Sequence, residues 1–407
     1  MNNMTKSLLL CLSGILTLPM QAQIRYMDSL FAPSLSQQDV IYGTATALAW
    51  PYLSETYTYA QNLLLDVYEP LGDTVSDRPC IVYAHGGAFL LGAKNDYPVV
   101  EFCERMTAKG YVVVSIAYRL GFNTNDSVSA QRATYRGIQD YHAAMRYVKQ
   151  HASVLGIDSN KVYGAGNSAG SIMAIHAAYM DESERVNFPA LTSTPDLGCL
   201  SCSGNAYQTG AKPKAIANLW GAIIDTAIIE SSDQIPAISF HGDQDGSVSP
   251  IHARPFSNPA FPKLFGSTMI HLRLSNLSVL NAYHVFVGAG HEPWGVFGTN
   301  LYMDSIVDAT ANFFYPMAAM TIDDNLKSDA VIHCYPSPSF DRMTMSWGLS
   351  LKPTQWRIVN AEGVVCLRGI LHGESEIDLA VNVLPAGWYR FAFAYDGRVF
   401  QQPFIKQ

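Results

Sequence analysis

The sequence predicts an α/β fold in which a doubly wound, mostly parallel sheet is followed by a small all-β sandwich domain. From about residue 60 to residue 315, short apolar runs alternate with amphipathic stretches, a pattern typical of parallel strands covered by helices on both faces. After residue 316 the chain changes to short β-type runs that are separated by turns at spacings near ten residues. Such spacing favours a small antiparallel sandwich.

Seven short apolar segments are expected to form the strands of the sheet: residues 63–68, 81–84, 112–116, 161–164, 215–220, 237–241 and 284–287. Helices are expected at 97–109, at 129–154, from Ser168 onward and at 299–314. In the second of these, Ile138, Tyr141 and Met145 recur at spacings of three and four, as on one face of a helix. Two loop-rich insertions, at 120–128 and 182–213, are expected at the carboxyl edge of the strands, where open α/β sheets bind ligands.

Composition excludes several classes of protein. The 407 residues are 48% hydrophobic, which is normal for a folded chain and rules out a disordered one. The net charge is −8 and no long basic run occurs, so the sequence predicts neither a nucleic-acid partner nor binding to an anionic membrane. Outside the N-terminus no apolar stretch reaches about 18 residues, so no transmembrane anchor is predicted.

The first 22 residues have the pattern of an export signal. Lys6 precedes an apolar run from Ser7 to Leu18, and Ala22 supplies a small residue at a plausible cleavage point. A buried first helix is the alternative interpretation. The sequence therefore divides into a signal peptide at 1–22, an α/β domain at 38–316 and a sandwich domain at 329–407.

Six cysteines follow the signal segment, and an exported protein can pair such residues. Cys199 and Cys202 are separated by two residues in a loop-like stretch. We expect a local disulfide or two free thiols there rather than half of a metal site, because no second CxxC occurs. Cys80 and Cys103 lie in apolar segments and are expected to behave as small core residues.

The stretch Gly166-Asn167-Ser168-Ala169-Gly170 follows a predicted strand and precedes an Ala-rich helix. A nucleophile on a sharp turn between strand and helix has a strained backbone, and the residues two positions away must be small. The two glycines meet that need. Ser168 is therefore the candidate nucleophile.

A second motif, from His85 to Phe89, comes directly after the strand at 81–84. Consecutive glycines after a strand can direct backbone N–H groups at a developing oxyanion. We assign Gly86, Gly87 and Ala88 to an oxyanion hole, together with the backbone N–H of Ala169. An ordinary glycine turn is the alternative.

A serine at neutral pH needs a base, and the base needs an acid to orient it. His291 follows the last predicted strand and is assigned as the base. Asp245 follows the strand before it and is assigned as the acid, with Asp243 as the competing carboxylate. The substrate pocket is expected to include Phe89, Asn167 and Trp220. No cofactor and no metal is predicted.

Together, the His85–Phe89 stretch, the Gly166–Gly170 turn, the 241–245 stretch and Gly290-His291 resemble the α/β-hydrolase carboxylesterases, including acetyl-esterase-like and hormone-sensitive-lipase-like enzymes. The resemblance covers residues 38–316 and implies a Ser-His-Asp triad, an acyl-enzyme intermediate and an ester as the substrate, either a small molecule or one linked to a polysaccharide. This sequence departs from the family pattern at Ala88, where a third glycine is usual.

The stretch from Cys334 to Arg342, with Tyr335-Pro336-Ser337-Pro338, resembles the opening of type IX secretion sorting domains, although Ser337 replaces the usual Asn. This resemblance implies the type IX secretion machinery as a partner and a place outside, or on the outer surface of, a Gram-negative bacterium. A carbohydrate-binding module is the alternative, since Trp347, Trp356 and Trp388 could stack on sugars, although such residues are more often core.

The sequence as a whole thus predicts a secreted serine carboxylic ester hydrolase. Two other functions remain open. One is a serine peptidase of the same fold, and the other is a non-catalytic cell-surface binding protein.

Overall fold

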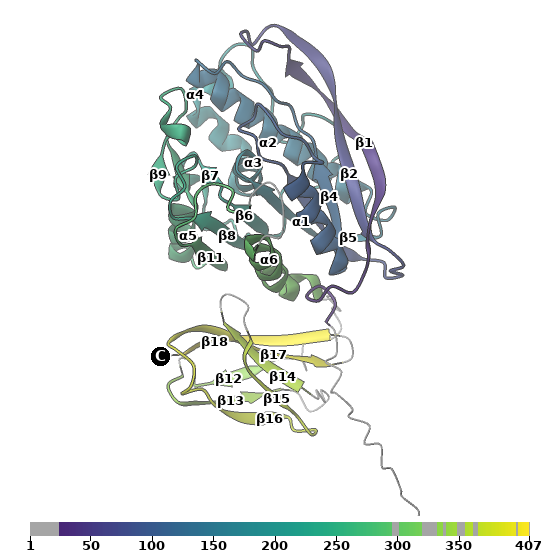
Figure 1. The fold of residues 1–407 in the computed structure, drawn as a ribbon, viewed down its shortest axis with the longest axis vertical. Helices are drawn as coiled ribbons and strands as arrows, with labels where there is room; N and C mark the ends of the chain where they lie inside the picture. The colour runs from purple at the N-terminus through teal and green to yellow at the C-terminus, as the bar shows by residue number, and fades with distance from the viewer. Residues whose placement is uncertain are drawn as a thin grey trace, which may run out of the picture.

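The computed structural model describes residues 24–294, 301–319, 332–336, 339–347, 355–360, 365–395 and 398–406. An α/β part carries most of the chain, and the last strands form a separate β part beside helix α6 (Figure 1). The predicted signal peptide lies outside the described residues. Ser337 and Pro338 of the tail motif lie outside them as well.

The α/β part is built on one eight-stranded sheet. Its strands are β1 (Pro33–Leu48), β2 (Thr58–Pro70), β3 (Arg78–Ala84), β4 (Val112–Ile116), β5 (Ile157–Asn167), β6 (Ile216–Leu219), β8 (Ala237–Gly242) and β11 (Asn281–Phe286). They lie in the order β1-β2-β4-β3-β5-β6-β8-β11. β1 and β2 pair antiparallel, as do β2 and β4, whereas the remaining pairs are parallel. The predicted mostly parallel sheet is confirmed.

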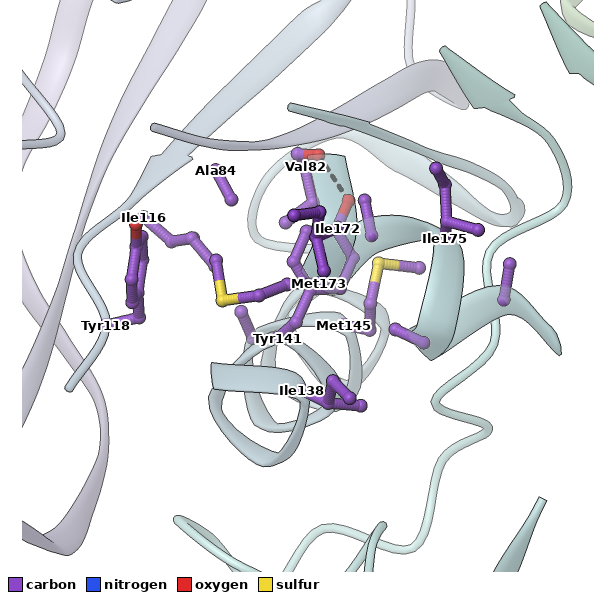
Figure 2. Close-up of a cluster of buried hydrophobic side chains, with 14 of the residues drawn as sticks. Val82, Ala84, Ile116, Tyr118, Ile138, Tyr141, Met145, Ile172, Met173 and Ile175 are labelled. Atoms are coloured by element: carbon purple, nitrogen blue, oxygen red, sulfur yellow. Dashed lines mark hydrogen bonds between the residues drawn. The ribbon is translucent and has the colours of Figure 1, made fainter. Parts of the chain in front are cut away.

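Helices cover both faces of this sheet: α1 (Tyr97–Ala108), α2 (Ser127–Gln150), α3 (Ala169–Tyr179), α5 (Ser267–Asn276) and α6 (Leu301–Ala319). Alternate residues of β3 point into different cores, because successive strand side chains face opposite sides. Val82 and Ala84 belong to the core with α2, α3 and α5, and Ile81 and Tyr83 to the core with α1 and α6. Figure 2 shows the first of these cores, where the Tyr141 hydroxyl donates to the carbonyl of Val82 at 2.8 Å.

The α/β part begins earlier than residue 38. Strand β1 starts at Pro33, and the segment before it already packs on the fold, since the Tyr26 side chain is buried and its N–H donates to the carbonyl of Lys109. Helix α2 starts at Ser127, where the Asp126 carboxylate accepts from the N–H of Val128. The preceding loop, predicted to be polar, has Phe122 buried within it.

Short elements lie beyond the carboxyl edge of the sheet. They are η1 (Glu182–Asn187), α4 (Pro189–Thr192), η2 (Thr226–Ile228) and η3 (Pro255–Ser257), with the strands β7 (Ala222–Ile223), β9 (His252–Ala253) and β10 (Leu264–Gly266) forming a small antiparallel sheet. Residues 188–195, here named the roof segment, are tied to α2 by the buried Arg132. Its guanidinium donates to the carbonyls of Ala190, Ser193 and Pro195, and it pairs with Glu55 at 2.7 Å.

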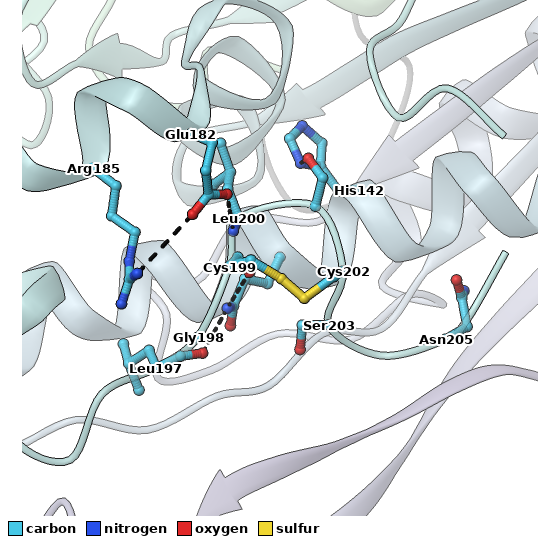
Figure 3. Close-up of a disulfide and its surroundings, with 12 residues drawn as sticks. His142, Glu182, Arg185, Leu197, Gly198, Cys199, Leu200, Cys202, Ser203 and Asn205 are labelled. Carbon is cyan, nitrogen blue, oxygen red and sulfur yellow. Dashed lines mark hydrogen bonds and ion pairs between the residues drawn. A yellow bond between two sulfur atoms is a disulfide. The ribbon is translucent and has the colours of Figure 1, made fainter. Parts of the chain in front are cut away.

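The Cys199–Cys202 pair is a disulfide with Cα atoms 5.7 Å apart, as one of the two predicted alternatives (Figure 3). Its loop is held on α2 by the amide of Gln139, which donates to the carbonyls of Leu197 and Cys199. The Ser201 hydroxyl donates to Nδ1 of His142 at 2.9 Å, since Nε2 of that ring donates to the carbonyl of Ala177. Cys80 and Cys103 are buried free thiols, as expected.

The C-terminal part is an antiparallel sandwich of two sheets. One contains β12 (His333–Tyr335), β13 (Arg342–Ser346) and β16 (Glu376–Ala380), and the other β14 (Gln355–Asn360), β15 (Val365–Ile370), β17 (Gly387–Tyr395) and β18 (Arg398–Lys406). Trp347 is buried in its core and Trp356 packs against that core, as structural tryptophans do. The Trp388 side chain lies outside the described residues. Arg357 joins the sandwich to the α/β part, with its guanidinium 5.6 Å from the centre of the Tyr315 ring.

Candidate active site

Ser168 lies on the turn between β5 and α3, near the centre of the sheet. Its backbone has φ 51° and ψ −119°, a strained conformation for a residue with a Cβ. The turn requires both glycines of the motif. A Cβ on Gly166 would lie 2.6 Å from the backbone of Gly170, and a Cβ on Gly170 would lie 2.1 Å from the carbonyl oxygen of Ala84. Neither backbone can move aside, so only glycine fits at these two positions.

The structure brings together the three residues predicted to perform the chemistry. Nε2 of His291 lies 2.9 Å from the Ser168 hydroxyl oxygen, and Nδ1 of His291 lies 2.7 Å from a carboxylate oxygen of Asp245. These residues follow β5, β8 and β11. Parallel strands place their carboxyl ends at one edge of the sheet, which explains how residues 123 positions apart meet.

Asp245, and not Asp243, contacts the base. Asp243 instead accepts a hydrogen bond from the backbone N–H of Gly288 at 2.7 Å. The Asp245 side chain is fully buried, and one of its oxygens accepts from the backbone N–H groups of Ser247 and Val248. Burial alone would raise the pKa of Asp245, but hydrogen bonds from His241 and His291 hold it well below its ordinary value. The carboxylate is therefore ionised at neutral pH.

A buried polar network lies behind Asp245, and sequence reasoning missed it. Nε2 of His241 is 3.1 Å from the Asp245 carboxylate and 2.8 Å from the carbonyl of Val248. Nδ1 of His241 is 2.7 Å from the Ser267 hydroxyl, which in turn accepts from the Asn218 amide. Because the Asn218 amide donates to the Ser267 oxygen, the Ser267 hydroxyl proton points to Nδ1 of His241. Nε2 of His241 therefore carries the ring proton and donates it to the Asp245 carboxylate and the carbonyl of Val248.

In the predicted oxyanion loop, the carbonyl groups of Gly86 and Gly87 accept hydrogen bonds from neighbouring groups. The Tyr118 hydroxyl and Nδ1 of His85 lie 3.2 Å and 2.6 Å from the carbonyl oxygen of Gly86, and the N–H groups of Leu90 and Leu91 donate to that of Gly87. In a trans peptide the C=O and the following N–H point in opposite directions. The N–H groups of Gly87 and Ala88 are thereby turned away from these partners. Ala169 is the first residue of α3, where the backbone N–H has no acceptor inside the helix.

An apolar pocket opens at Ser168. Ala88, Phe89 and Ala169 line it close to the serine, together with side chains from α2, α3, the roof segment and the 248–264 stretch. Of the three residues predicted to form the substrate pocket, Phe89 lines it, whereas Asn167 and Trp220 do not. Both side chains are buried behind the site in contacts with other residues.

Asn167 and Trp220 support the loop that carries His291. The Asn167 amide donates to the Glu292 carboxylate at 2.9 Å, and its oxygen accepts from the Tyr83 hydroxyl at 3.1 Å. Trp220 packs edge-to-face on Trp294 at 4.6 Å and lies 6.5 Å from the His291 ring. Glu292 is thus a further residue that positions the site, and no local pattern in the sequence signals it.

The described part of the chain holds no group of three His, Cys, Asp or Glu side chains that could bind a metal ion. None of the helices in this part is both long and apolar enough to cross a membrane.

Known proteins resemble this chain in sequence. Residues 65–223 match the BD-FAE family model, a stretch that includes the oxyanion loop and the Ser168 turn. The chain has an α/β-hydrolase fold. Its sheet order and the positions of the site residues after β3, β5, β8 and β11 agree with that fold.

The chain is similar to carboxylesterase 3 of Homo sapiens, with 32% identity over 150 residues, or 35% of this chain and 25% of that protein. Lipase 1 of Geotrichum candidum is 32% identical over 120 residues, or 28% of this chain and 21% of that protein. The chain thus spans a quarter or less of the length of these two relatives. The structure of Thermogutta terrifontis esterase 2 phosphoramylated by tabun covers 70% of this chain and 96% of its own, with 19% identity and a TM-score of 0.49.

Proposed function

We propose that the protein is a serine hydrolase that cleaves carboxylic esters through an acyl-enzyme intermediate. One observation carries the proposal: Ser168, His291 and Asp245 form a continuous hydrogen-bonded chain at the mouth of an apolar pocket. The relatives named above are esterases and lipases by name, which supports the same chemistry. The pocket suits the hydrocarbon part of an ester.

In the first half-reaction, the Ser168 oxygen attacks the ester carbonyl carbon while Nε2 of His291 accepts the hydroxyl proton. The ionised Asp245 stabilises the imidazolium that forms and holds Nδ1–H in place. The carbonyl oxygen becomes negatively charged and accepts hydrogen bonds from backbone N–H groups of Ala169, Gly87 and Ala88. Each such donor is typically worth about 10²–10³ in rate.

The intermediate collapses as the C–O bond to the alcohol breaks and His291 gives its proton to the leaving alkoxide oxygen. Water then attacks the acyl-Ser168 carbonyl, with His291 as the base. The acid leaves, and the proton returns to the Ser168 oxygen. The chain's own groups supply every proton transfer in this sequence, and the strained turn at Ser168 keeps the hydroxyl free of helix contacts.

A substrate panel tests the proposal. The purified protein should hydrolyse 4-nitrophenyl esters and should leave a matched peptide 4-nitroanilide uncleaved, because an ester is the easier acyl donor for a pocket that offers few polar groups to a peptide. Absorbance of the released 4-nitrophenol and 4-nitroaniline measures the two rates, and direct titration of the released acid checks them. Faster cleavage of the anilide would favour the peptidase, and no turnover of either would favour a binding protein.

We further propose that the C-terminal sandwich is a type IX secretion sorting domain and that the mature enzyme acts outside the cell or on its outer surface. The resemblance of the Cys334–Arg342 stretch supports this, as does the predicted signal at 1–22. The sandwich has a hydrophobic core of its own, separate from the two cores of the α/β part. A separate core is what a domain recognised on its own by other proteins would have.

A chain ending at Ala319 should keep most of its ester hydrolysis, because Ser168, Asp245 and His291 all lie before that point and contacts such as Arg357 with Tyr315 are peripheral to the site. In a host with type IX secretion the same truncation should leave the enzyme in the periplasm. Cell fractionation followed by an ester assay measures both effects. Loss of activity on a soluble ester would show that the sandwich completes the site, and normal export would exclude the sorting function.

A further inference from the structure

The apolar pocket follows one face of helix α3 away from the nucleophile. Ser168, Ile172, His176 and Met180 all line it, and each lies four positions after the one before. Residues four apart share one face of a helix, and the helix rises about 1.5 Å per residue. Met180 therefore lies roughly 18 Å along the helix direction from Ser168. The part of the pocket that runs along α3 from the reacting oxygen as far as Met180 is here named the channel.

The walls of this channel are uncharged. In the described part of the chain, no Asp, Glu, Lys or Arg lines it. The ring of His176 has both nitrogens occupied, since Nδ1 donates to the carbonyl of Ile172 at 2.7 Å and Nε2 accepts from the N–H of Ile224 at 3.1 Å. Burial lowers the pKa of His176 to about 4, so the ring is neutral at pH 7. A charged group would lose its water here without gaining a partner.

The pocket is also small, with a cavity volume of about 60 Å³. Ile138 of α2 lines it together with Phe188 and Leu191 of the roof segment. So small an apolar volume suits a single hydrocarbon chain better than a branched or ring-containing group.

Met180 lies at the boundary of a second cavity. That cavity has a volume of about 550 Å³ and is lined by polar residues that include Glu182, Ser201, Asn205 and Lys212, and Met180 lines it as well. Met180 is the residue that the two linings share. Its side chain is 2% exposed and is flexible as methionines are. Met180 thus lies between a small apolar cavity and a larger polar one.

We infer that the channel holds the acyl group of the substrate, that this group is an uncharged extended hydrocarbon chain, and that Met180 sets its length limit. The inference rests on the proposed ester hydrolysis and adds the acyl class to it. A chain that reached past Met180 would have to displace that side chain and place its apolar end among polar groups. Acyl chains that end before Met180 avoid both costs.

The test compares kcat/KM over 4-nitrophenyl esters from acetate to hexadecanoate. The wild-type protein should favour octanoate over acetate and should discriminate against hexadecanoate. Met180→Ala should raise the hexadecanoate-to-octanoate ratio about tenfold, the size of effect that small changes in an apolar pocket produce. Met145→Ala is the matched control, because Met145 is equally buried in the same core but lines neither cavity (Figure 2). Its ratio should stay at the wild-type value.

An unchanged ratio in an active Met180→Ala protein would overturn the inference while leaving ester hydrolysis intact. A folded wild-type protein that cleaves no ester in the series would overturn the proposed function, and the inference with it. If Met180→Ala does not fold, Met180→Val retains more of the side-chain volume and should move the ratio in the same direction. Equal turnover of the butanoate ester and the hemisuccinate ester by the wild-type protein would also contradict an uncharged channel.

Discussion

Ser168→Ala should lower ester hydrolysis by roughly 10⁶-fold, the loss seen when the nucleophile of a serine hydrolase is removed. The substitution deletes only the oxygen that attacks the carbonyl, and His291 and Asp245 keep their places. Labelling by a fluorophosphonate should disappear as well, because that reagent reacts with an activated serine. Both effects are measured on protein whose melting temperature is compared with that of the wild type.

Ser201→Ala is the matched control, since the Ser201 hydroxyl also donates to a histidine, Nδ1 of His142. Burial lowers the pKa of His142 to about 4, which makes that ring a weak base. This variant should retain wild-type hydrolysis and labelling. Undiminished labelling of the Ser168→Ala protein would show that another residue is the nucleophile.

Asp245→Asn should reduce kcat by about 10⁴-fold, because an amide cannot hold His291 in the tautomer that accepts the Ser168 proton. The neighbouring carboxylate supplies the control. Asp243 contacts the backbone N–H of Gly288 and not the base, so Asp243→Asn should change kcat by less than about tenfold, within the range of a peripheral contact.

Steady-state rates of the two variants with a soluble ester, measured at one slightly alkaline pH, provide the comparison. Their melting temperatures separate loss of chemistry from loss of folding, since Asp245 also accepts from the N–H groups of Ser247 and Val248. A larger loss of kcat in Asp243→Asn than in Asp245→Asn would contradict the assignment of the acid.

The sequence predicted the interior of the α/β part better than its edges. Strand β4 is a continuous apolar run and was predicted with the bounds the structure has, 112–116. Strand β1 was missed because it is an edge strand in which half of the residues are exposed and the register shifts, so no apolar run or regular alternation marks it. Helix α5 was missed because only three of its ten residues are buried, which leaves a weak periodic pattern.

The same division holds at the site. Ser168, Asp245 and His291 follow strands and carry recognisable chemistry, so motif and chain order were enough to nominate them. Asn167 was expected in the pocket because it adjoins Ser168, and Trp220 because it ends a predicted strand of the sheet. The direction of each side chain depends instead on contacts such as those with Glu292 and Trp294. His241 and Asn218 were not assigned, since a hydrogen-bond network across β6, β8 and α5 has no signature along the chain.

Arg132 attaches the roof segment to α2 through backbone carbonyl groups, so the side chains of that segment that line the pocket are free to vary. The guanidinium of Arg132 donates hydrogen bonds to the backbone carbonyls of Ala190, Ser193 and Pro195. The attachment therefore does not depend on the Leu191 side chain. Leu191 faces the channel, and substitutions there alter its width while the backbone stays anchored. A single substitution at Leu191 should therefore change the acyl preference without releasing the roof segment from α2.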